Sequence, residues 1–82
     1  MPINQIRETH QRQPFQPFHI HLADGRTLEV PHPEFLYIPP KGDRCIFVTD
    51  NDGTVEAVDL LLVVSLKPMK ARGNGYRRRK AG

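Results

Sequence analysis

The strongest chemical signal in the sequence is a run of basic side chains near its end. Residues 67–82 contain seven Lys or Arg, no Asp or Glu, and a single aromatic side chain. Guanidinium groups fit phosphate oxygens, each neutralised phosphate releases counterions, and a tyrosine ring can stack on an unpaired base. The composition therefore predicts nucleic-acid contacts from eight residues: Lys67, Lys70, Arg72, Tyr76, Arg77, Arg78, Arg79 and Lys80.

Several kinds of partner are compatible with this basic segment. We expect a nucleic acid, RNA before DNA, bound through its phosphates without reading of sequence. The alternative is an acidic protein partner, on which the chain would dock as an interaction or regulatory module; a purely solubilising role is the third possibility. A membrane is not expected, because residues 67–82 have no apolar face to insert.

Two histidines could together bind a metal ion. His19 and His21 are two residues apart, so they share one face of an extended strand. Zinc takes three or four nitrogen, oxygen or sulfur ligands, and no third ligand is evident beside this pair. We therefore predict no metal site, and we interpret both histidines as solvated strand residues that face Glu29 and Thr27 across the hairpin.

The sequence does not favour an enzyme. His32-Pro33-Glu34 contains a base and an acid, and Cys45 could act as a nucleophile beside a histidine. There is, however, no phosphate-binding loop, no clustered pair of carboxylates and no second catalytic motif. We interpret the prolines as fixing a bend between strands and Cys45 as a small core residue, and we predict no cofactor.

Length and charge divide the chain into one domain and a tail. A chain of 82 residues, of which 38% are apolar, has room for one small domain. Residues 1–66 contain five basic and nine acidic residues, a net charge of −4, against +7 for residues 67–82. We predict a domain over residues 1–68 and a flexible, disordered tail over residues 69–82, which has too few apolar side chains to fold. The single cysteine and the lack of a signal pattern predict a cytoplasmic protein.

Alternating apolar and polar residues predict a first hairpin. Residues 18–22 and 26–30 both alternate, as half-buried strands do. A three-residue loop, Ala23-Asp24-Gly25, pairs Ile20 with Leu28 and places the apolar side chains of both strands on one face.

A second hairpin and several shorter elements complete the prediction. Residues 44–49 precede a four-residue loop, Asp50-Asn51-Asp52-Gly53, which would set Val48 opposite Val55 and Ile46 opposite Ala57. The remaining elements are a helix over about residues 2–12 with Pro2 in its first position, a short strand or bend at 35–38, a tight turn at 59–61 and a last strand at 62–66. Together they predict a mainly β fold, a small five-stranded SH3-like barrel with a short N-terminal helix.

This order of elements is similar to the Sm-like fold, including the bacterial Sm-like RNA chaperone. Ile20-x-Leu22-x-Asp24-Gly25-x-x-Leu28 resembles the first Sm motif, and residues 58–64 resemble the family's fourth strand, one-turn connector and fifth strand. The resemblance implies RNA binding and assembly of a homo-oligomer through edge strands. The resemblance does not extend to the family's uridine pocket. In that family the connector residues that contact RNA are polar or basic, whereas the connector here is Asp59-Leu60-Leu61.

A more specific resemblance is to a small, largely uncharacterised bacterial family. It rests on Pro14-Phe15-Gln16-Pro17-Phe18-x-Ile20-x-Leu22-x-Asp24-Gly25-Arg26, on His32-Pro33-Glu34 and on the apolar end after Asp59. This resemblance covers residues 3–66 and implies the same fold, without an activity.

Overall fold

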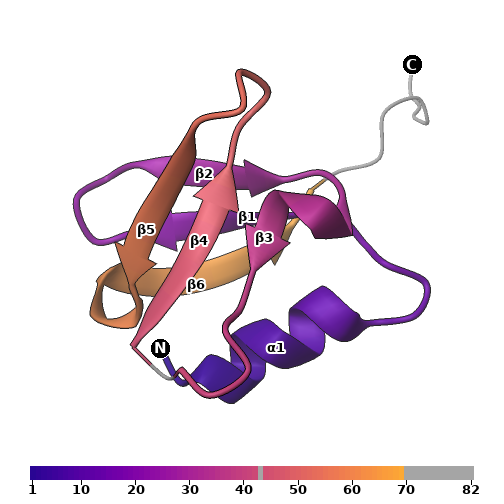
Figure 1. Cartoon of the computed structure of the whole chain (residues 1–82), viewed down its shortest axis with the longest axis horizontal. Helices are drawn as coiled ribbons and strands as arrows, with labels where there is room; N and C mark the ends of the chain where they lie inside the picture. Colours follow the sequence, from indigo (N-terminus) through magenta and orange to yellow (C-terminus); the bar gives the residue numbers. More distant parts are fainter. Residues whose placement is uncertain (43, 70–82) are drawn as a thin grey trace.

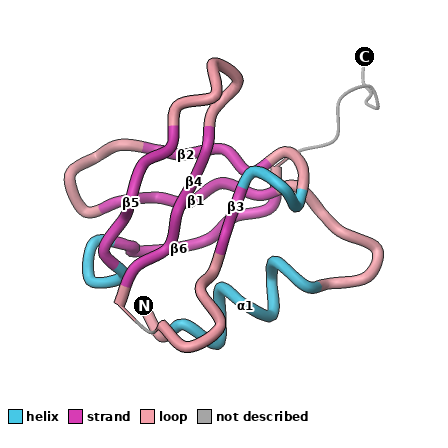
Figure 2. The backbone as a smooth tube through the Cα atoms, in the orientation of Figure 1, coloured by secondary structure: helices cyan, strands magenta, loops and turns pink. Residues whose placement is uncertain are grey.

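The computed structural model describes residues 1–42 and 44–69 (Figures 1 and 2). The element order confirms a mainly β fold behind one N-terminal helix. The elements are α1 (Ile3–Gln11), β1 (Phe18–Leu22), β2 (Thr27–Val30), the 3₁₀ helix η1 (Pro33–Phe35), β3 (Leu36–Tyr37), β4 (Cys45–Thr49), β5 (Val55–Asp59), the 3₁₀ helix η2 (Leu60–Leu62) and β6 (Val63–Pro68).

The strands form two antiparallel sheets that enclose one core. One sheet has the order β2-β1-β6 and the other β3-β4-β5, and the strands of the two sheets cross steeply (Figure 1). Each sheet contributes alternate side chains to the space between them, as expected for strands with one buried face. The buried core consists of Ile6, Phe18, Ile20, Leu22, Val30, Leu36, Ile46, Val48, Val58, Leu60 and Val63.

The prediction of a five-stranded barrel is wrong in the number of strands and in the closure of the barrel. Six strands are present where five were expected, and among the described residues they make two three-stranded sheets, not one closed barrel. The chain leaves the first sheet after Val30, where Pro31 and Pro33 interrupt extended pairing and η1 leads into β3 of the second sheet. Residues 70–82 of the predicted tail lie outside the described residues.

The register of the first hairpin is confirmed. Ile20 pairs with Leu28 and Phe18 with Val30. The Leu22 N–H donates to the Arg26 carbonyl, which encloses a three-residue loop, and Gly25 in that loop has φ +91°. This left-handed conformation is accessible to glycine at no steric cost.

The predicted register of the second hairpin is wrong by one residue. Val48 pairs with Glu56 instead of Val55, and Ile46 pairs with Val58 instead of Ala57. The Asp50 N–H donates to the Thr54 carbonyl, so the loop again has three residues and ends at a glycine, Gly53, with φ +82°. This register sets buried Val58 beside buried Ile46, whereas the predicted one would have placed exposed Ala57 there.

Helix α1 is fixed to the sheets at three points. The Met1 amino group donates to the Leu60 carbonyl at 2.9 Å, Ile6 is fully buried in the core, and His10 Nε2 lies 2.7 Å from the Pro33 carbonyl oxygen. The predicted helix over residues 2–12 is confirmed to within one residue at each end. Pro2 is not the first helical residue but the N-cap, because its backbone is extended with ψ 140°.

We predict that Gly25→Ala and Gly53→Ala each lower the free energy of unfolding by about 1–2 kcal/mol, the usual cost of a left-handed conformation for an L residue. A Cβ at either position meets no atom within 4 Å, so the loss arises from backbone conformation and not from a clash. Asparagine tolerates this conformation, so Gly25→Asn recovers much of the loss. Urea denaturation followed by circular dichroism measures both effects; equal losses for Ala and Asn would contradict this explanation.

Candidate nucleic-acid interface

One of the eight residues predicted to contact nucleic acid lies in the described part of the chain. Lys67 is exposed on β6, where it pairs in register with His19 of β1. The other seven lie outside the described residues: Lys70, Arg72, Tyr76, Arg77, Arg78, Arg79 and Lys80. Met69 is the last described residue, and its N–H donates to the Pro17 carbonyl at 2.9 Å. This bond holds the chain directly before the other seven residues.

A second cation joins Lys67 at this point. Arg12, directly after α1, and Lys67 line one shallow hollow of about 130 Å³. We call it the basic hollow; its lining residues are Thr9, Arg12, Gln16, Pro17, Phe18, Leu66, Lys67 and Pro68. Arg12 Nη1 lies 3.5 Å from Gln16 Oε1, at the limit of a hydrogen bond, which directs the guanidinium along the connection from α1 to β1. The hollow thus offers two positive groups and a side-chain amide to a phosphate.

Sequence reasoning missed Arg12, Thr9 and Gln16 as possible site residues. Arg12 and Lys67 are far apart in the chain and line one hollow because the connection after α1 leads into β1, which pairs with β6. No local pattern encodes that contact. The only available signal was the position of Arg12 beside the predicted helix end, which on its own indicates a solvated cation.

The histidine pair lies on the outer face of the first sheet, as its spacing predicted. His19 faces Glu29, with 3.6 Å between Nε2 and Oε2, and His21 Nδ1 lies 3.2 Å from the Thr27 hydroxyl. The two rings are 6.2 Å apart between centroids. The interpretation of both histidines as solvated is wrong for His21, whose Nε2 is buried and has no hydrogen-bond partner among the described atoms. Within residues 1–42 and 44–69, no three His, Cys, Asp or Glu side chains are grouped so as to hold a metal ion.

Cys45 and the His32 motif occupy separate elements. Cys45 is half-buried on β4 and faces Asp59 of β5. It was predicted to be a core residue, but it is only partly enclosed. His32 precedes η1, and its ring lies 5.8 Å from that of Phe35. Among the described residues no hydrogen bond joins Cys45 to a histidine.

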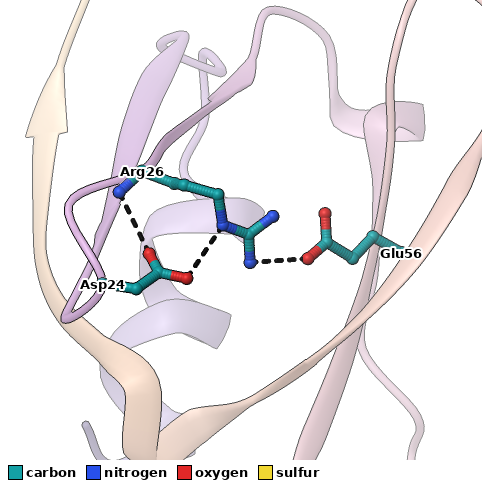
Figure 3. Close-up of polar contacts among 3 residues, drawn as sticks. All are labelled: Asp24, Arg26 and Glu56. Atoms are coloured by element: carbon teal, nitrogen blue, oxygen red, sulfur yellow. Dashed lines mark hydrogen bonds and ion pairs between the residues drawn. The ribbon is translucent and has the colours of Figure 1, made fainter.

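An ion-pair bridge joins the β1–β2 loop of the first sheet to β5 of the second sheet (Figure 3). Arg26, after the β1–β2 loop, donates to Asp24 at 2.9 Å and to Glu56 of β5 at 2.7 Å. The hydrogen bond that the guanidinium donates to Glu56, and then the one it donates to Asp24, raise the pKa of Arg26. The Arg26 backbone N–H and then its guanidinium hold the pKa of Asp24 below its usual value of 3.8.

An acidic groove lies beside this bridge, between β2 and the β4–β5 hairpin. It has a volume of about 270 Å³. Its lining residues are Thr27, Leu28, Glu29, Pro31, Phe35, Val48, Thr49, Asp50, Asn51, Thr54 and Glu56. Three of these are carboxylates, and none is Lys, Arg or His, so this described surface is opposite in charge to the basic hollow.

The chain matches no protein-family model, no characterised protein and no solved structure. The resemblance to Sm-like proteins therefore stays a prediction. In the described ranges no helix has both the length and the apolar character needed to span a bilayer.

We predict that Asp24→Asn lowers the free energy of unfolding near neutral pH, because it removes the charge bound to Arg26 while leaving an oxygen to accept the backbone N–H. The folded-state pKa of Asp24 is depressed, so the ionised form stabilises the protein above the unfolded pKa. The difference in free energy of unfolding between the native protein and Asp24→Asn therefore has its full size above about pH 5. It disappears as the pH falls below 3.8 and through the folded-state pKa of Asp24.

Asp52→Asn is the matched control, because Asp52 occupies the equivalent position of the second loop and forms no ion pair among the described residues. Urea denaturation of both variants from pH 2 to 7 makes the comparison. The bridge does not contribute through charge if Asp24→Asn lowers the free energy of unfolding equally at all pH values. The same conclusion holds if Asp52→Asn lowers it as much as Asp24→Asn does.

Proposed function

We propose that this protein is a non-enzymatic, cytoplasmic, nucleic-acid-binding protein that binds RNA in preference to DNA. The observation that carries the proposal is the basic hollow at the origin of the basic segment. Arg12 and Lys67 supply two cations there, and six more Lys or Arg follow between residues 70 and 82. A phosphate backbone that enters the hollow can continue along the segment, so the folded domain and the tail would form one binding surface.

The chemistry of these groups supports phosphate contacts in place of base-edge recognition. Arg12 offers a planar fork for two phosphate oxygens, and Lys67 offers a point charge beside it. Such contacts position a nucleic acid without reading its sequence. Tyr76 would stack on an unpaired base, which favours single-stranded RNA over a closed duplex.

The order of elements also supports, as part of this proposal, an Sm-like origin of the domain and membership of the bacterial family named above. Helix α1 precedes the strands, and the single turn η2 joins β5 to β6 at the position of the Sm connector. Both β5 and β6 are sheet edges in the described residues, so a second copy could pair with them to form a homo-oligomer.

A second candidate function, docking on an acidic protein partner, is favoured by an exposed apolar group. Leu61 is 81% exposed and Val64 61%, on η2 and β6 respectively. The apolar run Phe35-Leu36-Tyr37 offers a smaller surface, because Leu36 is buried in the core and Tyr37 is exposed. An apolar contact at Leu61 and Val64 combined with the basic segment would suit such a partner.

The decisive experiment is a binding titration with labelled single-stranded RNA at several salt concentrations. In a full-length six-Gln variant, Gln replaces each Lys and Arg of residues 70–82. We expect it to lose most of the affinity and to lower the slope of log Kd against log salt by about four, since each neutralised phosphate contributes about 0.7. Native affinity in this variant would refute the proposal, and a protein partner that survives nuclease treatment would then favour the second candidate.

The contribution of the basic hollow is tested separately. We expect Arg12→Gln and Lys67→Gln each to weaken binding of all RNA sequences alike and to lower the salt slope by about 0.7, the value for one phosphate on a single strand. Lys41→Gln is the matched control, because Lys41 is an exposed cation in the β3–β4 connection and does not line the hollow. Equal effects of all three substitutions would mean that only overall charge matters.

A further inference from the structure

The acidic groove has no role in the proposed function, although it is the larger of the two surface hollows described. Half-buried Leu28 and Phe35 and buried Val48 give it apolar walls. Glu29, Asp50 and Glu56 add carboxylates, and three threonines and Asn51 add neutral polar groups. Apolar walls with carboxylates suit an extended peptide that carries both cations and an aromatic ring.

The carboxylates of the groove keep oxygens free for such a ligand. Asp50 uses Oδ1 to accept the N–H groups of Asp52 and Thr54, and Glu56 uses Oε2 for Arg26. Glu29 is 61% exposed, and its nearest partner is His19 at 3.6 Å. Each side chain therefore retains at least one oxygen that can accept from a guanidinium or an ammonium group.

This chain itself contains a segment of matching chemistry. Residues 70–82 carry six Lys or Arg, no acid, and one aromatic side chain, Tyr76. Arginine forks complement carboxylates as well as phosphates, so the same groups suit both the groove and a nucleic acid. The groove and the segment are thus complementary in charge.

The segment is also long enough to reach the groove within one chain. Phe18 pairs with both Pro68 and Val30, so the end of β6 lies two strand spacings, about 10 Å, from the end of β2. Thirteen residues span up to about 43 Å when extended, and Tyr76 is seven residues beyond Met69, about 23 Å. Figure 1 shows the end of β6 on the same side of the molecule as η1, which also borders the groove.

We propose that residues 70–82 dock in the acidic groove of their own chain when no nucleic acid is bound, and that a nucleic acid displaces them. The second half of this inference rests on the proposed function, whereas the docking itself does not. Docking then lowers the apparent affinity of every ligand that has to displace the segment by one common factor, set by the fraction of molecules in which the segment is undocked. A ligand that binds the folded domain without these residues would not be affected.

Docking is tested first without RNA, by backbone amide chemical shifts in NMR. We compare the full native chain with the six-Gln variant and follow Thr27, Asn51 and Thr54 in the groove. The expected result is a shift difference at low salt that disappears as salt rises and is independent of protein concentration. No difference, a difference confined to the basic hollow, or one that grows with protein concentration overturns docking within one chain.

Displacement is tested next with a polyuridine RNA as the probe. As RNA is added, the chemical shifts of the groove amides in the native chain should change toward the values that they have in the six-Gln variant. Glu29→Gln should tighten RNA binding about two- to five-fold, the effect of one exposed ion pair, and should have no such effect in the six-Gln background. Glu8→Gln, an exposed carboxylate on α1 outside both hollows, is the matched control for long-range charge.

The two proposals fail in different ways. Groove shifts that depend on the segment, with no RNA binding, refute the proposed function and support docking. RNA binding without any groove response overturns docking and supports the proposed function. Equal gains from Glu29→Gln and Glu8→Gln also overturn the competition, because they reflect only the net charge of the domain.

Discussion

The structure depends on the burial of alternate side chains of β1. Phe18, Ile20 and Leu22 are at most 4% exposed, and β1 is the central strand of its sheet. Because side chains alternate along a strand, burying these three places His19 and His21 on the outer face. It also fixes the register of both neighbours, so that Leu28 and Leu66 face inward beside Ile20. A shift of one residue would reverse the inner and outer faces of β1, and the core would then contain two histidines.

The two hairpins show how far sequence can determine register. Both use a three-residue loop ending in a glycine of positive φ, Gly25 and Gly53, closed by the same pair of backbone hydrogen bonds. For the first hairpin, a two-residue Asp24-Gly25 turn would pair Ile20 with Glu29 and mix apolar and polar side chains on one face, so alternation on both strands excludes it. For the second, Ala57 and Val58 are both apolar, so alternation did not decide which of them faces Ile46. The Asp50 carboxylate, which accepts from Asp52 and Thr54, stabilises the shorter loop, and the similarity of Asn51-Asp52-Gly53 to Ala23-Asp24-Gly25 was the available signal.

The candidate site was less accessible to sequence reasoning than the strands. Composition identified the basic segment and Lys67, because both are local properties of the chain. Arg12 joins them only because α1 is held by the Met1 amino group at Leu60 and by His10 at Pro33, contacts across 59 and 23 residues. The Arg26 bridge has the same character, since Asp24 is two residues away whereas Glu56 belongs to the other sheet. Periodicity predicts which face of an element is buried, but not which polar groups of distant elements meet at its edges.

The separation of charge matters more than the net charge of +3. Exposed charges are screened beyond about 8–10 Å at physiological salt, so a ligand responds to the surface it touches and not to the whole molecule. The end of β6, beside the basic hollow, and the end of β2, beside the acidic groove, are about one such length apart across Phe18. At physiological salt a phosphate in the hollow is therefore only weakly repelled by Glu29 and the other groove carboxylates. At low salt the repulsion reaches the hollow, while attraction between the groove and the basic segment also strengthens. The apparent affinity for a nucleic acid is then set by the balance of these opposing terms, and not by the number of basic residues.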